Sequence, residues 1–196
     1  MPPKKEALSI DPEDMLSAEF AYIAETAAQA HEDRTSVISF FLIAVGSPLA
    51  AFFSTELLGS SNFVVTYGLF SGLFFVLTVV GTTTILQLAR LRAAWYESML
   101  AMNHMKEFII QHSEFDISGA FRWRVSTAPE KFNVNSVNFY QAIEVAILSG
   151  LLFAACIFFL LNGLRVSNQV LIWILSVGLG TLNIWFQMIL YRRFVN

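Results

Sequence analysis

Long stretches without a charged residue constrain this chain more than any other feature. No Asp, Glu, Lys or Arg occurs in residues 35–55, 57–89, 145–164 or 166–191. A bilayer core of about 30 Å is crossed by roughly 20 apolar residues in a helix, so each stretch is long enough for one span. The chain is also 56% hydrophobic and 14% charged, with a mean hydropathy of +0.59, as is typical of membrane proteins. The sequence therefore predicts an all-α integral membrane protein with four transmembrane helices.

The distribution of basic residues predicts how these helices are oriented. We expect the spans at 36–55, 63–88, 137–161 and 169–191. The two short connections between paired spans then lie on one side of the membrane. Of the twelve Lys and Arg residues, Arg165 alone falls on that side. Because positively charged loops stay in the cytoplasm, both termini, the connection 89–136 and the tail 192–196 are expected to be cytoplasmic.

The segment before the first span, residues 1–35, is expected to contain an amphipathic helix. Asp11 can cap its N-terminus, Pro12 suits the first helical position, and the acids that follow suit the first turn. Apolar residues then recur at spacings of three and four: Leu16, Phe20, Ile23, Ala27 and Ala30. No Gly or Pro follows before Gly46, so this helix is expected to continue into the first span.

The second span is also expected to continue as a helix beyond the membrane. Residues 89–112 contain no Gly or Pro, so 63–112 is predicted to be one helix whose end forms a cytoplasmic stalk. The rest of 89–136 is expected to be irregular. Opposite charges on the N-terminal helix and the stalk predict docking contacts between them. These residues are Glu25, Glu32, Arg34, Arg90, Arg92 and Glu97.

An ionisable residue inside a span is costly, and Glu144 lies about seven residues into the third one. Asn183 and Gln187 in the fourth span reach a similar depth and are its expected partners. Such a cluster could form a polar vestibule for an ion, a proton or a lipid headgroup. It could equally provide hydrogen bonds that hold the helices together, which is the interpretation we favour.

Small residues at every fourth position indicate close helix packing. Gly68 and Gly72 form a G-x-x-x-G pattern in the second span, and Ala146 and Gly150 belong to a similar series in the third. These patterns let helix backbones approach each other. They are equally compatible with contacts inside one subunit and with contacts between subunits.

No residue pattern points to a reaction. Di-metal carboxylate bundles use Glu-x-x-His pairs, and the sequence contains none. Phosphate-binding Gly-rich motifs are absent, and the single cysteine, Cys156, lies inside a span. A clustered basic face is missing as well, so we expect no nucleic-acid partner. The chain is therefore expected to be non-enzymatic, without a metal or cofactor, and surrounded by the lipid bilayer.

Two cytoplasmic stretches, 25–34 (ETAAQAHEDR) and 91–97 (LRAAWYE), resemble bacterial RipA-type octameric membrane proteins. This resemblance implies a homo-oligomer in the bacterial inner membrane, with its bulk facing the cytoplasm and with no established activity. It implies no active-site residues.

Together these observations predict a homo-oligomeric membrane scaffold or a pore-like, channel-like assembly. An accessory subunit bound to other membrane subunits in a larger complex would use the same packing patterns. A membrane enzyme with a cytoplasmic metal site is a third alternative.

Overall fold

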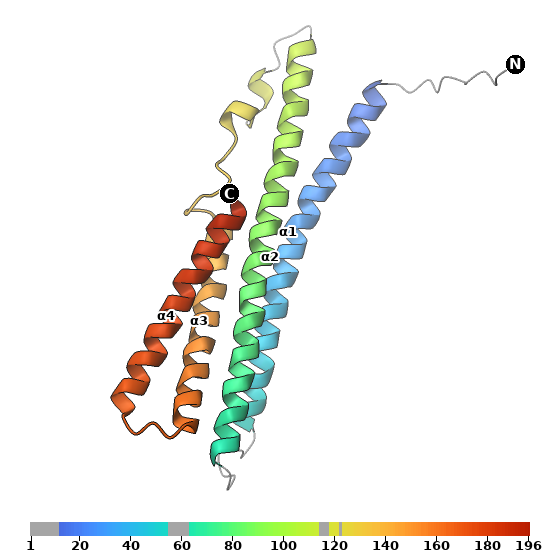
Figure 1. The fold of residues 1–196 in the computed structure, drawn as a ribbon. Helices are drawn as coiled ribbons and strands as arrows, with labels where there is room; N and C mark the ends of the chain where they lie inside the picture. The colour runs from blue at the N-terminus through green and yellow to red at the C-terminus, as the bar shows by residue number, and fades with distance from the viewer. Residues whose placement is uncertain (1–11, 55–62, 114–117, 122) are drawn as a thin grey trace, which may run out of the picture. The chain divides into compact units, whose positions relative to one another are not determined.

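The computed structural model describes residues 12–54, 63–113, 118–121 and 123–196. Within these ranges every regular element is a helix, which confirms the all-α prediction (Figure 1). The long helices are α1 (Pro12–Ser54), α2 (Phe63–His112), α3 (Val137–Gly163) and α4 (Gln169–Val195). Two short 3-10 turns, η2 (Ser118–Ala120) and η3 (Val125–Thr127), lie between α2 and α3 in the chain.

Local sequence accounts for where these helices begin. Ser136 caps α3 by accepting a hydrogen bond from the backbone N–H of Phe139, and Asn168 caps α4 by accepting one from Leu171. Serine and asparagine favour these positions because their side chains satisfy N–H groups that lack an intrahelical partner. Helix α2 has the same limits as the continuous helix expected over 63–112.

Three helices, α2, α3 and α4, are long and apolar enough to cross a membrane. Helix α1 contains residues 36–54 of the first expected span, and residue 55 lies outside the described residues. It passes through Pro48, which has no N–H to donate to the carbonyl of Ala44. The structure thus provides three candidate spans, and the fourth stays a prediction.

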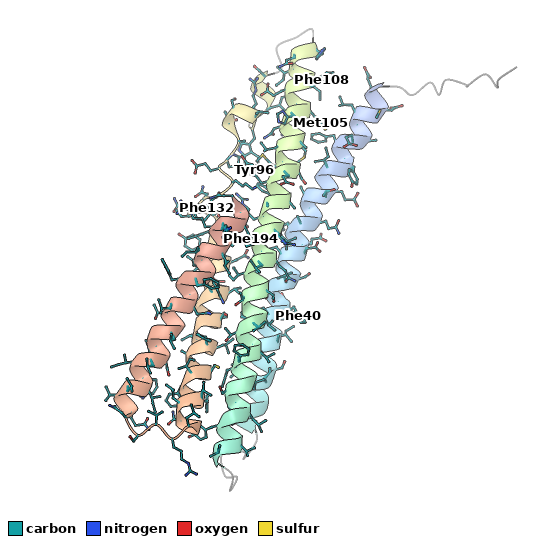
Figure 2. The ribbon with its side chains drawn as sticks, in the orientation of Figure 1. Phe40, Tyr96, Met105, Phe108, Phe132 and Phe194 are labelled. Atoms are coloured by element: carbon teal, nitrogen blue, oxygen red, sulfur yellow. The ribbon has the colours of Figure 1, made fainter. Side chains whose placement is uncertain are left out.

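The chain divides into two compact units, and α1 and α2 contribute to both. The larger unit contains Glu32–Ala93 and Glu130–Asn196, and all four long helices contribute to its core. Its fully or almost fully buried side chains include Phe41 from α1, Ile85 from α2, Val145 from α3 and Tyr191 from α4. Large apolar side chains also cover its outside, among them Phe40, labelled in Figure 2, and Trp185, each 66% exposed. An apolar exterior of this kind suits a lipid environment.

The smaller unit contains the beginning of α1, the end of α2 and the two 3-10 turns. Ala27 and Ala30 of α1 and Met99 and Asn103 of α2 are buried. An apolar groove of about 320 Å³ lies between these helices, lined by residues that include Phe20, Met105 and Phe121; Figure 2 labels Met105 on α2. The apolar spacing of the N-terminal helix therefore has a packing role within this unit.

Candidate functional site

The larger unit contains a buried polar junction, which we define as Gln187, Ser149, Thr82 and the backbone carbonyl of Thr78. Gln187 is fully buried, and its Nε2 donates to Ser149 Oγ at 2.7 Å and to Thr82 Oγ1 at 2.9 Å. Both hydroxyls donate to the carbonyl oxygen of Thr78. The hydroxyl protons are thus committed to this carbonyl, so only the amide nitrogen of Gln187 can serve as the donor to both oxygens. The junction ties α2, α3 and α4 together.

Close approach of the helices makes this junction possible. A Cβ atom on Gly81 would lie 2.5 Å from Ser149 Oγ, so α2 approaches α3 only because residue 81 has no side chain. A Cβ atom on Gly150 would lie 2.9 Å from the carbonyl oxygen of Gly180, and one on Gly180 would lie 2.8 Å from the Cβ of Ala154. Glycine therefore lets the backbones of α3 and α4 touch, and it lets the side chain of Ser149 pack against the backbone of α2.

The predicted packing residues divide into two groups. Ala146 is fully buried, and Gly150 lies at the close contact between α3 and α4. Gly68 and Gly72 are exposed, and a Cβ atom on either would meet nothing within 4 Å. Within the described residues, the G-x-x-x-G pattern of α2 therefore makes no close helix contact.

The structure does not bring Glu144 together with Gln187 or Asn183. Glu144 is exposed and lines a groove between α3 and α1 with Ile38 and Leu42, whereas Gln187 is fully buried. Five residues along an α-helix turn by about 140°, so Glu144 faces away from the direction of Ser149 on α3. The sequence predicts similar depths for these residues, but the rotation of α3 about its axis separates Glu144 from them.

Several polar side-chain oxygens in this unit are buried without a hydrogen-bond partner among the described residues. They are Gln141 Oε1, Ser176 Oγ, Asn183 Oδ1 and Gln187 Oε1. Three of them lie on α4 at intervals of seven and four residues, on the face that includes buried Gly180 and Tyr191. Since buried polar groups are usually paired, this face is more polar than close packing alone requires. Asn183 thus shares a helix face with Gln187 but has no recorded part in the junction.

The residues expected to dock the N-terminal helix on the stalk are mostly at the surface. Glu25, Glu32, Arg90 and Glu97 are exposed and make no hydrogen bond or ion pair with the described residues. Arg92 is buried and donates to the backbone carbonyls of Glu130 and Lys131. Its charge is thus used to hold the segment that precedes α3, which the sequence did not indicate.

Arg34 lies partly buried at the end of the larger unit that also contains Arg92 and Tyr191. Burial lowers the pKa of the Arg34 guanidinium; Tyr191 opposes this shift, and the positive charge of Arg92 adds to it. Arginine nevertheless stays protonated in proteins. Arg192 adds a third cation there, 5.5 Å from the ring centre of Phe132, within the range of a cation–π contact.

The smaller unit contains an ion pair that the sequence analysis missed. Arg124 donates through Nε and a terminal nitrogen to both carboxylate oxygens of Glu107, at 2.8 and 2.7 Å. These hydrogen bonds hold the pKa of Glu107 below its ordinary value. The pair connects α2 to the segment beside η3 across seventeen positions of sequence. No local pattern in the sequence indicates such a partner.

The sequence analysis also did not single out Ser149, Gly81 or Gly180. Ser149 stands next to Gly150 in a charge-free stretch, and that small, polar pair was the available signal for a close helix contact. The buried junction contains amides, hydroxyls and a carbonyl but no group that titrates near neutral pH. It can hold helices by hydrogen bonds but has neither a proton donor nor a nucleophile with an activating base.

Among residues 12–54, 63–113, 118–121 and 123–196, no group of three or more His, Cys, Asp and Glu side chains is placed to bind a metal ion. Comparison with known proteins found no matching family model, no matching curated protein and no matching solved structure.

Proposed function

We propose that this chain is a non-enzymatic subunit of a homo-oligomeric membrane scaffold or pore-like assembly. In this proposal residues 36–55 form a fourth span beside α2, α3 and α4, and both termini lie in the cytoplasm. The three long apolar helices and the apolar exterior of the larger unit support the membrane environment. The strongly uneven distribution of basic residues supports the orientation.

The observation that carries the oligomeric proposal is the exposure of Glu144 in a candidate membrane span. Glu144 is exposed on α3 about 10 Å from the beginning of the helix and has no partner among the described residues. A charged side chain facing lipid is costly, by about 2.5 to 3.5 kcal/mol for the costliest residue types at the centre of a span. Contact with another subunit removes this carboxylate from lipid and offers it hydrogen-bond donors.

The RipA-type resemblance implies a homo-oligomer in a bacterial inner membrane, which agrees with this proposal. The buried junction supports a scaffold more directly than a transport path, because it contains no titratable group and the helices around it pack closely. A pore would then form between subunits rather than through one of them.

The test is the mass of the particle, measured by native mass spectrometry after extraction into lipid nanodiscs without detergent. We expect one protein species with a mass equal to several copies of the 22.0 kDa chain. A single copy would refute the oligomeric proposal. Foreign chains in a fixed ratio would instead identify an accessory subunit of a larger complex.

A further inference from the structure

Helix α1 has a groove on each of its two flanks in the larger unit. The first, which we call the carboxylate groove, lies between α1 and α3 and is lined by Ile38, Leu42, Glu144 and neighbouring apolar residues. The second, which we call the amide groove, lies between α1 and α2. Its lining includes Ser36, Phe40, Thr83 and Gln87. Their volumes are about 330 and 450 Å³.

The two grooves face in different directions. Each residue of an α-helix turns the side chain by about 100°. Relative to Phe41, which is fully buried in the core, Ile38 and Leu42 lie about 60° and 100° to one side. Phe40 lies about 100° to the other side. The two surfaces are therefore distinct and cannot both belong to one self-complementary patch.

The polar groups of the two grooves lie at the same height. Helices α2 and α3 are antiparallel, because Ser71 bonds to Cys156 and Thr78 bonds to Ser149. Gly81 is level with Ser149, since a Cβ atom there would touch the serine hydroxyl.

Counting from this level, Glu144 lies five residues before Ser149, and Gln87 lies six residues after Gly81. At 1.5 Å per residue these displacements are about 7.5 and 9 Å in the same direction, a difference of about 1.5 Å. Arg90 lies one further turn along the face of α2 that contains Thr83 and Gln87.

The chemistry of the two grooves is complementary. Glu144 supplies a carboxylate that only accepts hydrogen bonds, whereas Gln87 supplies an amide N–H pair and Arg90 a guanidinium. Glu144, Gln87 and Arg90 are all exposed and make no hydrogen bond or ion pair with the described residues. A charge-assisted contact between them would be stronger than one between neutral groups.

We propose that the carboxylate groove of one copy packs against the amide groove of the next copy, with Glu144 bonded to Gln87 and Arg90 of its neighbour. All copies have the same orientation in a membrane, so a rotation axis along the membrane normal preserves height. Residues that meet across such an interface must therefore lie at equal depth, as Glu144 and Gln87 do. Two different surfaces that meet head-to-tail form a closed ring when the rotation closes. This inference rests on the proposed homo-oligomeric function.

The test is crosslinking between copies of the full chain in nanodiscs, with Cys156→Ser removing the only native cysteine. Glu144→Cys and Gln87→Cys are combined in one chain and treated with a short reagent that joins two thiols. We expect a ladder that extends beyond the dimer. Each single variant should give no ladder, because one thiol per chain then has no partner across the interface.

A depth-shifted pair provides the matched control. Leu151 is 60% exposed and lies on the same face of α3 as Glu144, about 10 Å further along the helix. Leu151→Cys with Gln87→Cys should therefore give no ladder. If Glu144→Cys prevents assembly, Ile147→Cys with Thr83→Cys replaces the pair, because these residues line the same two grooves and each lies two residues, about 3 Å, from the common level.

The outcomes separate this proposal from the proposed function. A product that stops at the dimer would indicate a two-fold interface and overturn the head-to-tail contact. A multi-copy particle that gives no crosslink with either groove pair would place the interface elsewhere while leaving the oligomer intact. A particle with the mass of one chain would overturn the proposed function as well.

Discussion

The close contact between α3 and α4 predicts opposite effects for two neighbouring glycines on α4. A Cβ atom on Gly180 would lie 2.8 Å from both the carbonyl oxygen of Gly150 and the Cβ of Ala154. These are a backbone atom and a short, rigid side chain, so the helices must move apart to admit a methyl group. Overpacking of this kind typically costs about 1 to 3 kcal/mol. Gly178, two positions earlier, would place its Cβ atom in open space.

Both substitutions gain the same helix propensity, because alanine is favoured over glycine by about 1 kcal/mol in a helix interior. We therefore expect Gly178→Ala to stabilise the fold by about that amount. Gly180→Ala should change stability by between about 0 and 2 kcal/mol in the unfavourable direction. The difference between the variants, about 1 to 3 kcal/mol, is free of the propensity term.

The assay is reversible unfolding in mixed micelles with increasing SDS, followed by far-UV circular dichroism. Gly180→Ala should unfold at a lower SDS fraction than wild type, and Gly178→Ala at a higher one. Equal transitions for the two alanine variants would refute the reasoning, because the α3–α4 backbone contact would then not limit the packing.

Two further predictions concern regions outside the bundle contacts. A nitroxide attached at Ser126 should become more mobile in electron paramagnetic resonance spectra as the pH falls through the lowered pKa of Glu107. In the Arg124→Gln variant, which lacks the ion pair, the same nitroxide should be mobile at every pH. A carboxyl whose pKa is lowered by folding stabilises the fold when the pH is above its pKa in the unfolded chain, and this contribution is lost as the pH falls and the carboxyl becomes protonated. A spectrum that does not change with pH would contradict this prediction. A cysteine at Ser167 should react with an impermeant reagent added outside intact cells, whereas one at Ser113 should not, and the reverse pattern would invert the proposed orientation.

The neutral chemistry of the buried junction bears on how the protein works. Amide and hydroxyl groups join Gln187, Ser149 and Thr82, and Glu144, the one carboxylate of α3, lies at the surface away from them. No charged group takes part in the contacts of this junction. The junction therefore holds the three helices by neutral hydrogen bonds alone, which agrees with the proposed scaffold.

Local sequence by itself determined which segments are helical and where several of them begin. Charge-free stretches mark the apolar segments, and the absence of Gly and Pro over 89–112 marks the long continuation of α2. Caps such as Ser136 and Asn168 bond to a backbone N–H three residues further along the chain, so they can be recognised from the sequence alone. These signals need no knowledge of neighbouring helices.

Only the tertiary structure decided which face of each helix meets which neighbour. Residue counting placed Glu144 and Gln187 at similar depth, but the rotation of α3 about its axis directs one to the surface while α4 buries the other. The same holds for the glycines: Gly68 and Gly72 form the G-x-x-x-G pattern but face open space, whereas Gly150 makes the close contact between α3 and α4. Helix rotation depends on the packing of side chains distant in sequence, because backbone hydrogen bonds hold a helix equally well at every angle about its own axis.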